Sequence, residues 1–196
     1  MKKVGVLALQ GDFEAHEKAL ARAGASPSQV RSPSDLNGLD GLVIPGGEST
    51  TMLKLLRAED MLEPLKEFGR QRPIFGTCAG AILLASEVSH PAQESLGLMD
   101  IGVERNAYGR QIESRVTHVQ PEAAFTSRTS PGGHAREIEA VFIRAPIIRR
   151  LGPDARVLAR YQDDPVLVEE GRHLVTTFHP ELTADSRVHE FFLSKL

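Results

Sequence analysis

Short apolar runs alternate with amphipathic segments through the first half of the chain. Each run stops at a glycine or proline turn, as expected of strands that are buried on both faces of a sheet. The segments between the runs repeat apolar residues every three or four positions, which is typical of helices packed on such a sheet. The predicted strands are residues 4–9, a stretch around Val30, residues 42–44 and residues 73–75. The predicted helices are residues 13–23 with Asp12 as cap, a short helix containing Met52, Leu55 and Leu56, residues 61–68 and residues 79–87.

The second half of the chain has apolar runs with few helical segments between them. Strands that follow one another without a crossover helix pair as antiparallel hairpins. Residues 120–139 are rich in Ser, Thr, Gly, Pro and charge, so they are predicted to form a surface loop. The predicted strands are residues 101–105, 112–119, 140–144, 156–161, 165–169 and 173–178, and residues 188–196 form a closing helix. The pattern therefore predicts an α/β fold, with a mostly parallel central sheet flanked by helices and an antiparallel extension in the second half.

Composition narrows the class of protein. The length fits one domain spanning residues 1–196. The 23 Lys and Arg nearly balance the 26 Asp and Glu, leaving a net charge of −3 and no basic stripe for a nucleic acid. No apolar run approaches the length of about 18 residues that a membrane span needs. Cys78 is the single cysteine, which excludes an internal disulfide and favours a reducing compartment, so we expect a cytoplasmic protein.

Cys78 lies in the most informative segment of the sequence. It follows a predicted strand, precedes a predicted helix, and has Gly76 and Gly80 two residues away on either side. This is the form of a nucleophile elbow with cysteine in place of serine, because the sharp turn exposes the side chain and the glycines avoid clashes. The dipole of the following helix favours a thiolate at Cys78. The backbone N–H of Ala79 is the first of the helix's N–H groups that have no acceptor within the helix. The alternative is a buried structural cysteine.

His179 supplies the base that a cysteine nucleophile needs. It follows an apolar strand, and Glu181 lies two residues on, so the carboxylate can reach one imidazole nitrogen while the other faces a thiol. Pro180 restricts the backbone between them. The remaining histidines lack such a carboxylate, and solvated or capping roles are favoured for them: His16, His90, His118, His134, His173 and His189.

A third segment, residues 45–50, also follows a buried strand. The adjacent Gly46 and Gly47 let backbone N–H groups approach a ligand or an oxyanion. The alternative is a plain loop in which Ser49 or Thr50 caps the next helix. The sequence has no P-loop spacing, no dinucleotide fingerprint and no paired-histidine metal motif, so neither a metal nor a cofactor is expected.

Together and in this order, the three segments resemble the class I glutamine amidotransferases. The closer similarity is to the glutaminase subunits of pyridoxal 5′-phosphate synthase, and it extends over nearly the whole chain. The stretches that carry it are residues 5–11, 41–52, 75–80, 103–111, 141–146 and 178–183.

The resemblance implies a Cys-His-Glu triad that hydrolyses L-glutamine. Cys78 would attack the carboxamide, His179 would act as base and then acid, and Glu181 would orient His179. Backbone N–H groups of Gly47 and Ala79 would form the oxyanion hole. The implied substrate contacts are Gly46, Gly47, Glu48, Ser49, Arg105, Ile143 and Arg144. Their chemistry fits, because an α-carboxylate needs a guanidinium or N–H donors and an α-ammonium needs a carboxylate or carbonyl.

The resemblance also implies a partner. Family members deliver ammonia to a separate synthase subunit that makes pyridoxal 5′-phosphate, in a complex of twelve synthase and twelve glutaminase subunits. Such a glutaminase is poorly active until it docks. The polar segment 120–139 looks longer than the family's usual connection there.

Three alternatives remain at this stage. A glutaminase of another pathway would use the same triad. Only the stretches that resemble the glutaminase subunits of pyridoxal 5′-phosphate synthase argue against it. A non-catalytic binding module on the same fold is disfavoured because all three triad members are present. A cysteine hydrolase of the peptidase or chaperone type shares the elbow, but the segment 46–49 and the His-Pro-Glu order count against it.

Overall fold

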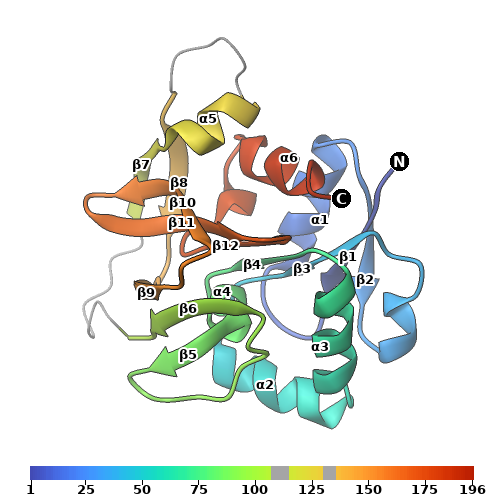
Figure 1. Cartoon of the computed structure of the whole chain (residues 1–196). Helices are drawn as coiled ribbons and strands as arrows, with labels where there is room; N and C mark the ends of the chain where they lie inside the picture. Colours follow the sequence, from blue (N-terminus) through green and yellow to red (C-terminus); the bar gives the residue numbers. More distant parts are fainter. Residues whose placement is uncertain (107–114, 130–135) are drawn as a thin grey trace.

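A computed structural model describes residues 1–106, 115–129 and 136–196 of the chain (Figure 1). Within this part, a nine-stranded sheet runs through the centre of the molecule. Its strands, in spatial order, are β2 (Ser26–Val30), β1 (Lys3–Leu7), β3 (Gly41–Ile44), β4 (Ile74–Thr77), β12 (His173–Thr176), β11 (Asp164–Glu170), β10 (Ala155–Tyr161), β7 (Arg115–Pro121) and β8 (Ile138–Phe142).

The sheet has a parallel half and an antiparallel half. Strands β2, β1, β3, β4 and β12 are parallel to one another, whereas β12, β11, β10, β7 and β8 pair antiparallel. The junction is β12, which joins β4 on one side and β11 on the other. This arrangement confirms the predicted α/β fold with an antiparallel extension.

Helices cover both faces of the sheet (Figure 1). One face carries α1 (Phe13–Arg22), α5 (Ala123–Thr129) and α6 (Arg187–Leu193), and the other carries α2 (Ser49–Ala58), α3 (Leu62–Gln71) and α4 (Ala79–Leu84). The parallel strands are buried on both sides, so successive residues enter different cores: Leu42 and Ile44 pack with the α2–α4 layer, and Val43 packs with the α1–α6 layer. Short 3₁₀ turns are η1 (Pro33–Leu36) and η2 (Pro180–Leu182).

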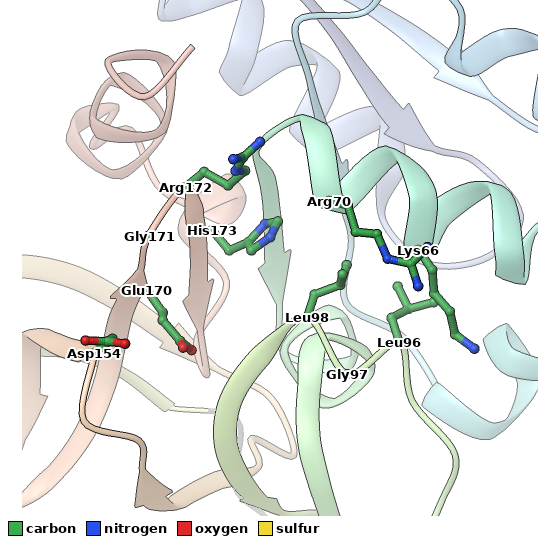
Figure 2. A pocket seen from close by; sticks show the side chains of 11 residues that line it. Lys66, Arg70, Leu96, Gly97, Leu98, Asp154, Glu170, Gly171, Arg172 and His173 are labelled. Atoms are coloured by element: carbon green, nitrogen blue, oxygen red, sulfur yellow. The ribbon is translucent and has the colours of Figure 1, made fainter.

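The amino end of β12 is anchored by a buried histidine. His173 Nδ1 accepts a hydrogen bond of 3.2 Å from the backbone N–H of Ile74, the first residue of β4. Beside this ring lies an open hollow between α3 and the turn before β12, lined among others by Lys66, Arg70 and Arg172 (Figure 2).

The helix predicted for residues 79–87 is too long. The structure ends α4 at Leu84, where Ala85 turns to extended backbone, and residues Ala85–Ser89 form strand β5. This strand pairs with β6 (Met99–Glu104), and β6 pairs with β9 (Ile147–Leu151), making a three-stranded second sheet within the described part. Pairing with β6 overrides the apolar helical pattern, and the buried Ala85 and Val88 both pack into the core that includes the α2–α4 layer.

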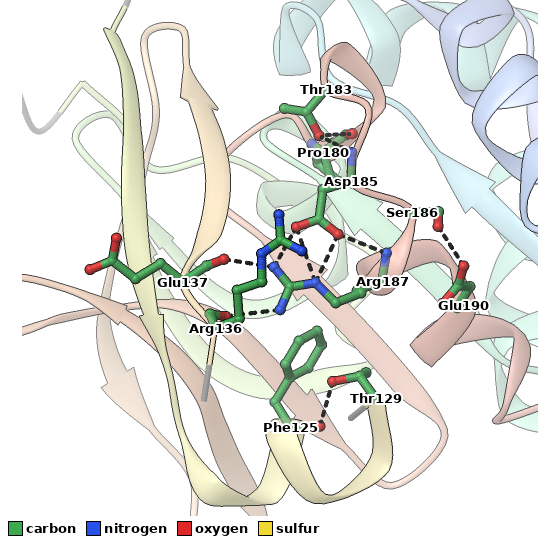
Figure 3. Close-up of polar contacts among 10 residues, drawn as sticks. All are labelled: Phe125, Thr129, Arg136, Glu137, Pro180, Thr183, Asp185, Ser186, Arg187 and Glu190. Carbon is green, nitrogen blue, oxygen red and sulfur yellow. Dashed lines mark hydrogen bonds and ion pairs between the residues drawn. The ribbon is translucent and has the colours of Figure 1, made fainter. Parts of the chain in front are cut away.

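The loop predicted for residues 120–139 is wrong over part of its length. Residues Ala123–Thr129 form α5, whose Phe125 is fully buried and stacks on Phe191 of α6 with ring centroids 5.2 Å apart. Further on, Arg187 donates to the backbone carbonyls of residues 136 and 137 and pairs with Asp185 (Figure 3). Residues 130–135 lie outside the described part. Tertiary packing on α6 thus selects a helix that the composition does not indicate.

The other boundaries agree to within a few residues. The strand predicted for residues 140–144 is shifted, since β8 ends at Phe142, and the first part of the one predicted for 112–119 lies outside the described residues. The closing helix ends at Leu193. Asp12 occupies the N-cap position of α1, but its side chain makes no capping hydrogen bond. Among the helices that the structure describes, none is long and apolar enough to cross a membrane.

Candidate functional site

Three neighbouring parallel strands end at one edge of the sheet and deliver the predicted site residues. The loop after β3 brings Gly46 and Gly47, Cys78 directly follows β4, and His179 follows β12 after two residues. The backbone N–H of Cys78 donates to the carbonyl of Thr176 at 2.8 Å, which ties the end of β4 to the end of β12. Carboxyl ends of parallel strands are where α/β folds place their ligand sites.

Cys78 has the strained backbone expected of a nucleophile elbow. Its φ of 50° and ψ of −102° lie in a sparsely populated region for a residue with a side chain. The turn is possible because a Cβ at Gly76 would lie 2.6 Å from backbone atoms of Gly80, and a Cβ at Gly80 would lie 2.2 Å from the carbonyl oxygen of Ile44. Both flanking positions therefore have to be glycine.

His179 and Glu181 form a buried pair next to the cysteine. Nδ1 of His179 donates to Oε1 of Glu181 at 2.7 Å, and the backbone N–H of His179 donates to the carbonyl of Val141 at 2.8 Å. His179 is 7% exposed and Glu181 is 5% exposed. Because Nδ1 is taken by Glu181, Nε2 is the nitrogen left for Cys78, with which the imidazole also interacts.

The electrostatics favour a charged imidazole and a charged carboxylate. Burial opposes the charged form of His179, but contacts with Cys78 and Glu181 outweigh it and raise the pKa of the imidazole well above its usual value. Burial likewise opposes the carboxylate, yet His16 and His179 hold the pKa of Glu181 below its usual value. An imidazolium is thus stable between a sulfur and a carboxylate.

A cleft of about 490 Å³ opens above Cys78 and His179. All seven predicted substrate contacts line it, including the exposed Ile143 and Arg144 of the turn after β8. Two predicted residues lie outside its lining: Ala79, buried at the start of α4, and Glu181, behind His179. The predicted residues in the lining are Gly46, Gly47, Glu48, Ser49, Cys78, Arg105, Ile143, Arg144 and His179.

Hydrogen bonds within the protein hold the loop at residues 46–49 in place. Glu48, rather than Ser49 or Thr50, caps α2, because its side chain accepts from the backbone N–H groups of Thr50 and Thr51. These bonds outweigh burial and lower the pKa of Glu48 to about 2. Arg105 donates to Thr50 Oγ1 at 2.8 Å and to Glu48 Oε1 at 3.3 Å.

The hydroxyl of Ser49 is engaged away from the triad. Its Oγ donates to Oε1 of Gln93 at 2.9 Å, and Ser49 is 3% exposed.

On the other side of the cleft, Arg144 has a positive φ of 46°, and the thiol of Cys78 lies 3.8 Å from the carbonyl oxygen of Ile143.

Sequence reasoning missed several residues of the site. Gln10 accepts from the backbone N–H of Glu48 at 3.1 Å and fills the space in which a Cβ at Gly47 would lie. The apolar run that ends at Gln10 was the available signal. The cleft is also lined by Gly11, Asp12, Ile82, Asn106, Pro146 and Leu182.

The solvated roles expected for the remaining histidines are wrong for three of them. His16 and His189 are fully buried behind Glu181, and His173 is buried at the other end of β12. No local pattern distinguishes them, because their partners are distant in the sequence. His90 and His118 are exposed, and His134 lies outside the described residues.

No group of three or more His, Cys, Asp and Glu side chains in residues 1–106, 115–129 and 136–196 is arranged to hold a metal ion. The site brings together a thiol, an imidazole and a carboxylate, a combination that can activate a cysteine as a nucleophile.

Comparisons with known proteins agree with this geometry. A model of the SNO glutamine amidotransferase family matches residues 6–196. The pyridoxal 5′-phosphate synthase subunit PdxT of Solibacter usitatus (strain Ellin6076) is 65% identical over 196 residues, 100% of both chains. That of Koribacter versatilis (strain Ellin345) is 55% identical over 192 residues, 97% of this chain and 94% of the relative. A crystal structure of a glutamine amidotransferase aligns with a TM-score of 0.87 and 46% identity, over 98% of this chain and 97% of that one. This chain belongs to the SNO glutamine amidotransferase family.

Proposed function

We propose that this protein hydrolyses L-glutamine to glutamate and ammonia, with Cys78 as nucleophile, His179 as proton carrier and Glu181 as the group that orients His179. The observation that carries the proposal is the line of these three side chains beneath the cleft, in a chain of a glutamine amidotransferase family. Strain at Cys78 supports it, because such strain concentrates at functional positions.

The first half of the reaction makes a thioester. Nε2 of His179 takes the proton of the Cys78 thiol, and Sγ forms a bond to the carboxamide carbon of glutamine. The tetrahedral intermediate collapses when its C–N bond breaks, and the leaving nitrogen takes the proton from His179 and departs as ammonia. Glu181 keeps Nδ1–H of His179 directed toward itself throughout, so Nε2 stays available.

The second half regenerates the enzyme. His179 accepts a proton from water, whose oxygen attacks the thioester carbon. The C–S bond then breaks, the proton returns to Sγ of Cys78, and glutamate is released. The same imidazole acts as base and acid in both halves, which suits a histidine whose charged form is stabilised from both sides.

Backbone N–H groups of Gly47 and Ala79 are the proposed oxyanion donors. Ala79 is the first residue of α4, and the first N–H groups of a helix have no intrahelical acceptor. Gly47 has a φ of 148° and is packed against the Gln10 side chain, so its peptide has a defined orientation. Fixed donors of this kind stabilise developing negative charge without reorganisation.

The charged groups of the cleft match the α-substituents of glutamine. Glu48 is ionised at neutral pH and is the proposed partner of the α-ammonium. Arg105 and Arg144 present guanidinium groups that suit the α-carboxylate, and Ile143 supplies a wall beside the thiol. Gly46 and Ser49 complete the loop that faces the substrate.

The proposed consumer of the ammonia is a synthase subunit. The full-length relatives are named subunits of pyridoxal 5′-phosphate synthase, so we assign this chain the same role of supplying ammonia for pyridoxal 5′-phosphate. Direct delivery is chemically useful, because free ammonia near pH 7 is mostly ammonium, which is no nucleophile. We place the complex, with twelve copies of each subunit, in the cytoplasm, where the lone Cys78 stays reduced.

Glutamate release tests the proposal. The full chain is assayed with L-glutamine, first alone and then mixed with a purified pyridoxal 5′-phosphate synthase subunit, with Cys78→Ala as the control. Strong activation on mixing supports both the chemistry and the partner. High activity that is indifferent to the synthase assigns the same triad to another pathway. An inactive mixture, with docking confirmed by sedimentation, overturns the proposed function.

A further inference from the structure

A buried line of polar contacts continues beyond Glu181 into the interior of the molecule. Nε2 of His16, on α1, lies 3.3 Å from Oε2 of Glu181 and 3.1 Å from Oγ1 of Thr77. Nδ1 of His16 lies 3.1 Å from Nε2 of His189, on α6. The side chains of His16 and Glu181 have no exposed surface, and His189 and Thr77 are also fully buried. Helices α1 and α6 lie side by side on this face of the sheet (Figure 1).

The contacts of the two histidine rings indicate which of their nitrogen atoms carry a hydrogen. Oε1 of Glu181 already accepts from His179, whereas the buried Oε2 makes no hydrogen bond in the described chain and has Nε2 of His16 as a neighbour at 3.3 Å. A lone pair on Nε2 of His16 would face the lone pairs of that carboxylate oxygen and be repelled. Nε2 therefore carries the hydrogen, and Nδ1 of His16 accepts from Nε2–H of His189. Nδ1 of His189 has no hydrogen-bond partner in the described chain, and in this assignment it is a lone pair rather than a buried N–H without an acceptor.

Both additional histidines are neutral in this arrangement. Burial lowers the pKa of His16, although Glu181 and Asp12 oppose that effect and His179 adds to it. Burial, together with His16 and Arg22, lowers the pKa of His189 to about 3. A neutral donor fixes the position of a carboxylate without cancelling its charge, so the full charge of Glu181 remains for the imidazolium of His179.

We propose that His16, oriented by His189, is a positioning residue of the triad: its Nε2–H lies against Oε2 of Glu181, with 3.3 Å between the nitrogen and the oxygen, and thereby keeps Oε1 directed toward His179. The inference rests on the proposed glutamine hydrolysis and deepens it, because His16 does not line the cleft and acts only through Glu181.

Two variants of His16 separate the donated hydrogen from the packing. His16→Phe keeps a ring in the place that now packs edge-on against Phe75 at 6.2 Å, but has no N–H. We expect kcat to fall on the order of tenfold, the rate equivalent of losing one polar contact with a charged group, with KM unchanged. His16→Gln restores an N–H donor near the position of Nε2 and is expected to recover most of the rate.

A matched control uses the other end of the sheet. His173→Phe removes a buried histidine that contacts the backbone of Ile74 and none of the triad, so its kcat should equal that of the unsubstituted protein. All variants are assayed with the synthase subunit present, and their melting temperatures are compared. Equal losses in His16→Phe and His173→Phe would overturn the inference, because they would report general destabilisation.

Combining substitutions distinguishes this inference from the proposed function. In a Glu181→Gln background, His16→Phe should lower kcat little further, since the group through which it acts is already altered. Full additivity of the two losses overturns the positioning role. If the unsubstituted protein itself hydrolyses no glutamine, the proposed function fails first. If it is active and His16→Phe is equally active, only the inference about His16 fails.

A measurement on the unsubstituted chain covers the case in which His16→Phe does not fold. ¹⁵N NMR of histidine-labelled protein reports the protonation of each ring nitrogen. We expect His16 to be protonated at Nε2 and not at Nδ1 between pH 6 and 8. A ring protonated at Nδ1 alone, or at both nitrogens, contradicts the assignment.

Discussion

Both ends of the parallel half-sheet carry a hollow beside a buried histidine. At the amino end of β12, about 660 Å³ of space is lined by Lys66, Arg70, Arg172 and His173, among others (Figure 2). At the carboxyl end, the cleft above Cys78 measures about 490 Å³. The larger hollow has no cysteine, serine or threonine in its lining, whereas the smaller one contains Cys78, so size does not identify the reactive end.

The two hollows differ more in the electrostatics of their ionisable side chains than in their volumes. At the amino end, Lys66 and Arg70 pair with acidic residues of their own helix, and burial together with Arg172 and Lys195 lowers the pKa of His173 to about 4. At the carboxyl end, the pKa of His179 is raised because a thiol and a carboxylate converge on it. A histidine with a raised pKa, which suits proton transfer, is found where ionisable groups from different strands converge. It is not found where each charged side chain pairs with a neighbour on its own helix.

Removing the nucleophile should have the largest effect. Cys78→Ala is expected to lower glutamine hydrolysis by at least about a thousandfold, because the covalent route is lost. Glutamate release in the presence of the synthase subunit measures this. Arg172→Ala, at the amino-end hollow, is the comparison and should leave the rate unchanged. Substantial turnover by Cys78→Ala would remove it as the nucleophile.

The two partners of Cys78 should differ in their effects. His179→Asn removes the proton carrier, whereas Glu181→Gln removes only its orienting charge. We expect His179→Asn to cost roughly a thousandfold in kcat and Glu181→Gln roughly a hundredfold. Steady-state kinetics at saturating glutamine measure both, with circular dichroism as the check on folding. The reverse order would contradict the roles assigned here.

Much of the carboxyl-end site could be predicted because its signals are local. Gly76, Cys78 and Gly80 lie within five positions, and His179 and Glu181 lie two apart after an apolar strand. The antiparallel extension was likewise visible as apolar runs without helices between them. These features depend on backbone geometry that neighbouring residues determine.

The features that were missed depend on distant contacts. His16 is 165 positions from Glu181, and α5 forms because Phe125 packs on Phe191, far along the chain. Strand β5 pairs with β6, whose pairing with β9 joins segments nearly 50 residues apart. Local composition carries no record of such contacts, and tertiary packing overrides propensity in each case.

Glycine-to-alanine substitutions at the two ends of the sheet should lower the free energy of unfolding by different amounts. A Cβ at Gly80 would lie 2.2 Å from the carbonyl oxygen of Ile44, so Gly80→Ala forces β3 and α4 apart and should cost about 3 kcal/mol. Gly171, at the amino-end hollow, has a φ of 54° and open space around it, so Gly171→Ala should cost only about 1 kcal/mol of backbone strain. Urea denaturation measures both free energies of unfolding. Equal costs would show that close approach at the elbow is not the constraint.

The pH dependence of stability should show the same contrast through the titration of two histidines. Because the pKa of His173 falls from 6.5 unfolded to about 4 folded, acidification from pH 6.5 to 4 protonates the unfolded chain first and removes roughly 3 kcal/mol of stability. His179 acts with the opposite sign: its raised pKa contributes stability that is complete below pH 6.5 and is lost as pH rises through the folded value. His173→Asn should therefore flatten the acid side of the stability profile and His179→Asn the alkaline side, as measured by urea denaturation at a series of pH values. If both variants flattened the same side, the two histidines would have the same charge state in the folded protein, and the electrostatic distinction between the two ends of the sheet would be wrong.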